Sequence, residues 1–215
     1  MITINNVIAQ TPETQKSITS NMAIELLKKG NERFVNNTSL NRIHSNNIES
    51  TTNGQYPFSV VLSCIDSRVP TEIIFDQGIG DMFNACVAGN VVNEDILGSM
   101  EYACKYAGVK LVVVLGHTSC GAVKGACDSL KDGNLTNLLG RISPAIKVTK
   151  TKENEARDSS NIDYVNRVAT NNVALTKKDI CAKSKILNDM YKSNEIDIVT
   201  AMYDVKTGKV IFLNK

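Results

Sequence analysis

A thiol, a carboxylate and a guanidinium stand on alternate positions of one short stretch of the chain, "LSCIDSRV" at 62–69. They belong to Cys64, Asp66 and Arg68, and they follow an apolar run that has no need of charge. In an extended segment alternate side chains project from the same face, so these three groups are expected to share one. All three side chains are chemically reactive, so this face is a candidate functional site. The rest of the sequence must indicate which other groups lie near it.

A second stretch, "GHTSCGAVKGA" at 116–126, supplies two soft ligands at His117 and Cys120. Residues three apart lie on one side of a turn or of a first helical turn. With Cys64 they make a set of two thiolates and one imidazole, which suits Zn²⁺ and leaves a fourth position open, as catalytic zinc sites do. The alternative is that the cysteines are buried thiols and the histidine is a core residue.

Two other kinds of site fit these residues less well. The glycines of 116–126 have the spacing of a phosphate-binding loop, but Ala122 and Val123 stand where that loop has lysine and serine or threonine. A cysteine phosphatase needs its arginine farther from the thiol than Arg68 is from Cys64. We therefore favour a metal site.

Length and composition set limits on the protein. The chain has 215 residues, 42% of them apolar, and a net charge of +2, which fits one soluble domain and favours neither a nucleic-acid nor a membrane partner. Its longest apolar run is "LVVVL", too short to cross a bilayer. The first residues lack a signal-peptide pattern, so we expect a cytoplasmic protein, although "VIAQ" at 7–10 resembles the end of a cleaved export signal and leaves periplasmic export open. The six cysteines are expected to be free thiols.

The pattern of apolar residues predicts an α/β fold with a mostly parallel central sheet flanked by helices. The predicted elements also give an antiparallel edge at the C-terminus and a helical arm near the N-terminus. We expect an N-terminal extension at 1–19 and a single catalytic domain at 20–215. The expected strands are 57–63, 82–88, 110–116 and a hairpin from 196 to 213. The expected helices are 20–35 with a cap at Ser20, 71–77, 93–108, 119–131, 134–150 with a kink at Pro144, 161–174 and 176–192, and the charged stretch 151–160 is expected to be mobile.

The sequence resembles the β-class carbonic anhydrases, in the branch that includes the plant enzymes. "CIDSR", followed after a strand, a helix and a strand by "GHTSCG", matches the signature of that family, and "GNERFV", "GDMF", "AGN" and "GSMEYA" agree with it. The similarity runs from about residue 20 to the C-terminus. It implies a lyase that interconverts CO₂ and bicarbonate by way of zinc-bound hydroxide, with one Zn²⁺ per chain.

The resemblance also implies roles for particular residues. Cys64, His117 and Cys120 would bind zinc, and Asp66 and Arg68 would form a catalytic dyad beside it, with Asp66 a possible fourth ligand in a closed state. Four residues match substrate-binding positions of the family, namely Gln55, Phe83, Tyr102 and Gly121. In the family, the residues at the positions of Phe83 and Tyr102 reach the site of a neighbouring subunit.

Several properties remain open at this point. The family forms homodimers or tetramers in which residues 20–35 would wrap a partner, and the sequence does not choose between them. Cys86 stands where many relatives have arginine, and the chain has no tryptophan, so we do not predict inhibition by bicarbonate at a separate site. The alternatives to CO₂ hydration are hydrolysis of carbonyl sulfide or carbon disulfide at the same zinc, and a non-catalytic homologue with structural zinc. Two thiolates cancel the metal's formal charge, so a bound water molecule would be less acidic than at a site with three histidines. Activity is therefore expected to favour alkaline pH.

Overall fold

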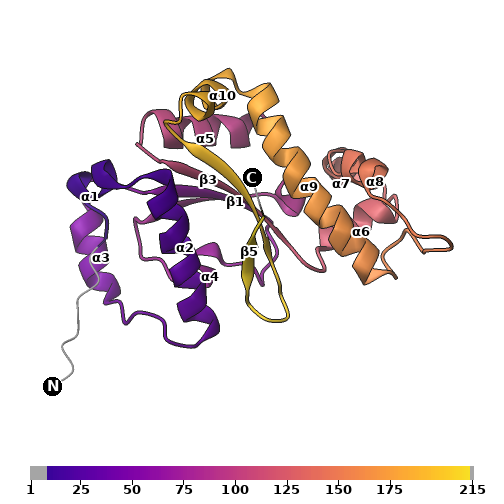
Figure 1. Cartoon of the computed structure of the whole chain (residues 1–215), viewed down its shortest axis with the longest axis horizontal. Coiled ribbons are helices and arrows are strands. Elements are labelled where there is room, and N and C mark those ends of the chain that lie inside the picture. Colours follow the sequence, from indigo (N-terminus) through magenta and orange to yellow (C-terminus); the bar gives the residue numbers. More distant parts are fainter. Residues whose placement is uncertain (1–8, 214–215) are drawn as a thin grey trace.

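In the computed structural model, which describes residues 9–213, the apolar runs of the sequence form a five-stranded sheet in the order β2-β1-β3-β4-β5 (Figure 1). The first four of these strands are parallel to their neighbours, and β5 is antiparallel to β4. This confirms the expected parallel sheet with an antiparallel edge. The strands are β1 (Ser59–Ser63), β2 (Met82–Cys86), β3 (Leu111–His117), β4 (Asp197–Tyr203) and β5 (Val210–Phe212).

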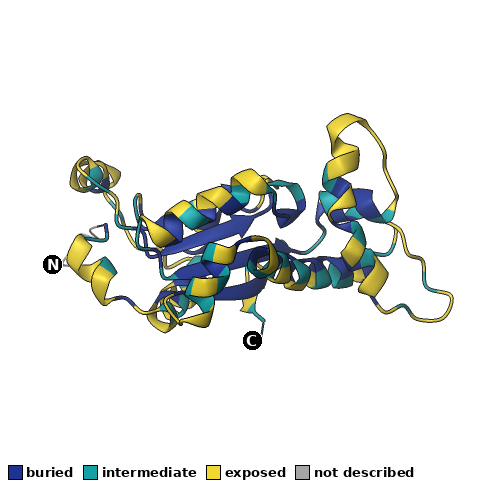
Figure 2. Ribbon diagram, turned by 90° about the horizontal axis from the view of Figure 1, so that it is seen from above, coloured by how far each residue is buried: buried dark blue, intermediate teal, exposed yellow. Residues whose placement is uncertain are grey.

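Helices cover both faces of the sheet, because the central strands are apolar on both sides. On β3, Val112 and Val114 belong to one apolar cluster, and Leu111, Val113 and Leu115 belong to the other. Figure 2 shows the buried strands between helices whose outer sides are exposed. The first cluster includes residues of α5 (Glu94–Lys105), α6 (Gly121–Cys127), α7 (Gly133–Gly140), α8 (Ser143–Val148), α9 (Ile162–Lys183) and α10 (Lys185–Lys192), and the second includes residues of α2 (Ser20–Val35) and α4 (Thr71–Ile74).

Several predicted helix boundaries need correction. The cap of α2 is Thr19, whose side chain accepts a hydrogen bond from the Met22 amide, rather than Ser20. The predicted helix at 134–150 is two helices, since Pro144 lies in the first turn of α8 instead of kinking a longer helix. The predicted break near residue 175 is wrong. Helix α9 continues to Lys183, and Ser184 then caps α10.

The described part of the N-terminal extension packs on the domain. It contains α1 (Pro12–Ser17), and the Gln15 side-chain amide donates to the backbone carbonyls of Pro57 and Ala107 at 2.7 Å each. In the "VIAQ" stretch, residues 7 and 8 lie outside the described residues. No helix in the described part of the chain is long and apolar enough to cross a membrane.

Residues 36–55 and 151–160 are the longer connections. The first contains α3 (His44–Thr51). The second projects beside α9 (Figure 1), where the Glu155 carboxylate accepts a hydrogen bond from Arg167 at 2.5 Å and from the Lys152 amide at 2.9 Å. Its mobility stays a prediction.

A close approach of α2 to α4 gives a test of the fold. A Cβ added at Gly30 would overlap the backbone carbonyl of Phe75, which cannot move without shifting α4. We expect Gly30→Ala to destabilise the protein by about 1–3 kcal/mol, as overpacking does. The control is Gly98→Ala on α5, where the added Cβ meets no described atom within 4 Å. That change should stabilise by about 0.5–1 kcal/mol. Urea unfolding of both variants measures this, and equal stabilities would contradict the packing.

Candidate metal centre

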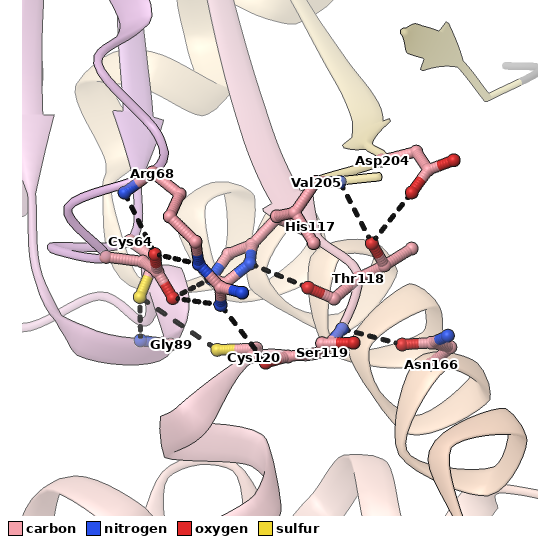
Figure 3. Close-up of polar contacts among 11 residues, drawn as sticks. Cys64, Arg68, Gly89, His117, Thr118, Ser119, Cys120, Asn166, Asp204 and Val205 are labelled. Carbon is pink, nitrogen blue, oxygen red and sulfur yellow. Dashed lines mark hydrogen bonds and ion pairs between the residues drawn. The ribbon is translucent and has the colours of Figure 1, made fainter. Parts of the chain in front are cut away.

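The two chemically unusual stretches meet at one edge of the sheet. Cys64 directly follows β1, His117 is the last residue of β3, and Cys120 is the N-cap of α6. Because β1 and β3 are adjacent and parallel, their carboxyl ends lie side by side. The three side chains point toward one another (Figure 3), and their candidate ligand atoms all lie within 4.8 Å of one another.

The donor atoms of this cluster fit a tetrahedral metal ion. The two sulfur atoms are 3.9 Å apart, close to the roughly 3.8 Å that two Zn–S bonds of about 2.3 Å impose at a tetrahedral angle. The Nδ1 atom of His117 lies 2.9 Å from the Thr118 carbonyl oxygen, and since a carbonyl only accepts, Nδ1 carries the proton. The Nε2 lone pair therefore faces the sulfur atoms, and this buried atom has no hydrogen-bond partner among residues 9–213. A buried nitrogen that has no hydrogen-bond donor, together with two thiols beside it, forms a ligand set. A metal ion would satisfy all three atoms.

The two thiols influence each other strongly. The Cys120 thiol donates a hydrogen bond to Cys64, which lowers the pKa of Cys64, and the Gly89 amide also donates to that sulfur at 3.3 Å. The same hydrogen bond, together with burial, raises the pKa of Cys120. Two thiolates whose sulfur atoms are 3.9 Å apart repel each other unless a cation compensates for their charge. A divalent metal would supply that compensation.

Asp66 and Arg68 form a bidentate pair beside the cluster. The Arg68 Nε donates to Asp66 Oδ1 at 2.9 Å, and its Nη2 donates to Oδ2 at 2.8 Å. Asp66 Oδ2 is also 3.8 Å from His117 Nε2, so the carboxylate borders the space that the three ligands face. The expectation of an extended segment is wrong here. The Val69 amide donates to the Asp66 carbonyl, which closes a turn over 66–69 and folds Arg68 back onto Asp66.

This ion pair has a consequence for stability at low pH. Hydrogen bonds from Arg68 lower the pKa of Asp66 to about 2, below the roughly 3.9 of an unfolded chain. Asp66 therefore adds stability above about pH 4 that is lost as the pH falls toward 2. We expect Arg68→Ala to reduce the loss of unfolding free energy between pH 5 and pH 2.5. Urea unfolding at both values tests this. Lys183→Ala, which breaks the exposed pair with Asp179, is the control and should leave that difference unchanged.

A cavity of about 480 Å³ opens beside the cluster. Asp66 and Arg68 line one part of it, and Gly121 lies in the same wall as Cys64, although its contact with substrate stays a prediction. The remaining wall is largely apolar. It is formed by Ile65, Ala88, Ala122, Leu130, Leu135 and Leu139, together with Ser67 and Gly125.

Three residues expected to bind substrate lie away from the cluster in the single chain. Gln55 is exposed and precedes β1, whereas Cys64 follows it, so the two are at opposite ends of that strand. Phe83 and Tyr102 lie together, with ring centres 6.4 Å apart, in a separate cavity of about 800 Å³ along β2 and α5. Their roles at a metal centre stay predictions that require a second copy of the chain.

Other residues around the cluster were not singled out by sequence reasoning. Thr118 Oγ1 donates to Asp204 at 3.2 Å and accepts from the Val205 amide, and Ser119 N donates to Asn166 Oδ1 at 2.8 Å (Figure 3). An asparagine inside a helical pattern is expected to lie at the surface. The contact between Asn166 and Ser119 therefore becomes evident only from the fold.

Cys86 is exposed on β2. Its sulfur lies 2.9 Å from Asn84 Oδ1 and 3.2 Å from Ser63 Oγ, so hydrogen bonds occupy the position at which many relatives were expected to have arginine.

Comparisons with known proteins agree with this geometry. A family profile described as "Carbonic anhydrase" matches residues 59–210. "Carbonic anhydrase 2" of Mycobacterium tuberculosis is 35% identical over 88% of this chain and 90% of its own length. A carbonic anhydrase of Mycolicibacterium smegmatis is 41% identical over 67% of this chain and 73% of its own. Among solved structures, a β-carbonic anhydrase of Aspergillus fumigatus has the same fold, with a TM-score of 0.70, 24% identity and 90% coverage of both chains.

Proposed function

Because this chain belongs to the β-class of the carbonic anhydrase family, whose activity is the hydration of CO₂, we propose that it carries out this reaction with one Zn²⁺ held by Cys64, His117 and Cys120. The observation that supports the zinc is the buried, unpartnered Nε2 of His117 beside two sulfur atoms 3.9 Å apart. When bound, zinc would lower the pKa of a water molecule and so make hydroxide available near neutral pH.

The side chains around the ligands supply the rest of the chemistry. Asp66, held by two hydrogen bonds from Arg68, stays ionised at neutral pH and can only accept hydrogen bonds. Its Oδ2 accepts one from the nucleophilic water and so directs the oxygen lone pair toward the carbon of CO₂. As the new C–O bond forms, one C=O π bond of CO₂ opens onto its oxygen, which gives bicarbonate, and the proton released from the water passes to solvent. The apolar wall that includes Ile65 and Leu139 suits an uncharged substrate.

We propose that Asp66 is paired with Arg68 in the resting enzyme and is not a zinc ligand. The bidentate contact occupies both carboxylate oxygens, and a move onto the metal would have to break it. The alternatives have less support. A non-catalytic homologue would need a broken dyad or a lost ligand, and all five residues are present. A narrowed or extended pocket entrance would favour carbon disulfide or carbonyl sulfide, whereas the relatives that match this chain are described as carbonic anhydrases.

We also propose that the enzyme is a homodimer or tetramer in which a second copy adds Gln55, Phe83 and Tyr102 to each site. A structurally similar β-carbonic anhydrase from Sordaria macrospora is described as tetrameric. The buried face of α2 packs on its own sheet, so contacts of this helix with a partner would use exposed residues such as Met22.

Mixed assemblies test this sharing of sites. Tyr102→Ala and Cys120→Ser subunits should each have low activity alone. Refolded together, they should regain part of it, because a mixed dimer contains one site with neither change. Activity that does not rise on mixing, in assemblies shown to contain both chains, would contradict a shared site.

Zinc reconstitution tests the metal. Protein stripped with a chelator should lose CO₂ hydration and recover it linearly up to one Zn²⁺ per chain, whereas Mg²⁺, which prefers oxygen ligands, should restore nothing. Full activity of verified metal-free protein would overturn the proposal.

A further inference from the structure

We propose that helix α9 positions the metal ligands through two asparagines, Asn172 and Asn166, and so sets how tightly the chain holds zinc. This inference rests on the proposed zinc site. Helix α9 packs along the sheet beside β3 and contributes no ligand of its own to the cluster.

The first connection runs from Asn172 to Cys64. Asn172 is 2% exposed, and its Nδ2 donates to the Gly89 carbonyl at 2.7 Å. The amide of the same Gly89 donates to the Cys64 sulfur at 3.3 Å. Asn172 thus holds the residue whose N–H points at the sulfur (Figure 3 shows the Gly89 contact).

Gly89 suits this connection because of its backbone. Its φ is +71°, a conformation that favours glycine, and an added Cβ would lie 2.6 Å from Ile142 Cδ1. Asn172 holds the carbonyl on one side of this residue, and Ile142 and Ala122 lie close beside it, so the backbone that carries the N–H is held from two directions. A hydrogen bond to a thiolate stabilises the charged sulfur that a metal requires.

The second connection runs from Asn166 to His117 through a single peptide group. The carbonyl of the 118–119 peptide accepts the proton of His117 Nδ1 at 2.9 Å, and the N–H of that peptide donates to Asn166 Oδ1 at 2.8 Å. Asn166 therefore fixes the group that sets the tautomer and direction of the imidazole. Ser119 has a φ of +56°, unusual for a residue with a side chain, and such strain persists only where neighbouring contacts hold it.

The two asparagines have opposite chemical requirements, which gives a sharp test. Asn172 acts as a donor, so the isosteric Asn172→Asp removes its function. Asn166 acts as an acceptor, so Asn166→Ala removes its function and Asn166→Asp keeps it. The matched control is Asn171→Asp, one position along the same helix. Asn171 Nδ2 donates to the Thr149 hydroxyl, so Asn171→Asp also removes one donated hydrogen bond of α9, but that bond leads to no residue of the cluster.

The readouts are the zinc dissociation constant, from competition with a chromophoric chelator, and the thiolate-to-cobalt charge-transfer band of the Co²⁺-loaded full-length protein. We expect Asn172→Asp and Asn166→Ala to weaken zinc binding by about 10- to 100-fold, as loss of an outer partner does, and to shift the cobalt band. Asn166→Asp and Asn171→Asp should match the wild type in both.

Three outcomes would overturn the inference. The first is the same affinity and the same band in all four variants. The second is weaker binding in Asn171→Asp as well. The third is a loss of affinity that only parallels a lower melting temperature of the metal-free protein. If Asn172→Asp does not fold, the comparison of Asn166→Ala with Asn166→Asp tests the inference by itself. Asn166 is only half-buried, so both of these variants are expected to fold. Failure of wild-type protein to take up zinc would instead contradict the proposed function.

Discussion

Replacing Cys120 with serine is expected to remove zinc from the protein and to reduce CO₂ hydration to near the uncatalysed rate. A thiolate is a soft, charged ligand for Zn²⁺, whereas a serine hydroxyl stays neutral and binds it weakly. Cys120 is 1% exposed and its sulfur is 3.9 Å from that of Cys64, so the change removes one of the three ligand atoms that face one another in the cluster. Zinc affinity should fall by more than the roughly 100-fold that loss of an outer partner can cost.

Zinc content after dialysis, measured by atomic emission, and stopped-flow hydration on the same sample test this result. Cys181→Ser is the control, because Cys181 is a half-buried free thiol on α9 outside the cluster. It should keep full zinc and full activity. A Cys120→Ser variant that retains one zinc per chain and a wild-type rate would contradict the ligand assignment.

The second large effect is expected from Asp66→Asn, which should lower kcat by about 100- to 1000-fold, the range seen when one preorganised catalytic hydrogen bond is lost. The carboxylate accepts hydrogen bonds at both oxygens, while an amide presents an NH₂ group on one side. That group would face either Arg68, which has only donors to offer, or the nucleophilic water. In both orientations, the oxygen beside His117 becomes a weaker acceptor for the hydrogen bond from the nucleophilic water.

Zinc content separates this effect from metal loss. Because Asp66 is paired with Arg68, Asp66→Asn should keep one zinc per chain, and Arg68→Ala should also keep it while lowering the rate less. A loss of zinc in Asp66→Asn would indicate that the carboxylate is a ligand in the resting enzyme, contrary to the proposal.

Most of the fold could be predicted from the sequence, because the central strands β1, β3 and β4 are buried and mostly apolar. "LVVVL" forms residues 111–115 of β3, and the helix expected at 20–35 has those bounds in the structure. Helix ends were predicted less well. Residues 174–176 contain no glycine or proline to justify a break, and the real boundary depends on the cap at Ser184.

The candidate site could be predicted in part. Residue types and their places at strand ends were enough to bring Cys64, His117 and Cys120 together, since neighbouring parallel strands end at one edge. The route by which Arg68 reaches Asp66 could not be predicted, because it depends on a turn rather than on strand alternation. The contacts of Asn166 and Asn172 join segments far apart in sequence, so no local pattern reveals them.

Stopped-flow CO₂ hydration at pH 7 and pH 8.5, on purified protein whose zinc content is known, tests the central claim most directly. Fast hydration with one zinc per chain, and a higher rate at pH 8.5, is the predicted result, since two thiolate ligands make the nucleophilic water less acidic than neutral imidazoles would. Protein that contains a full equivalent of zinc but does not accelerate hydration at either pH would contradict it.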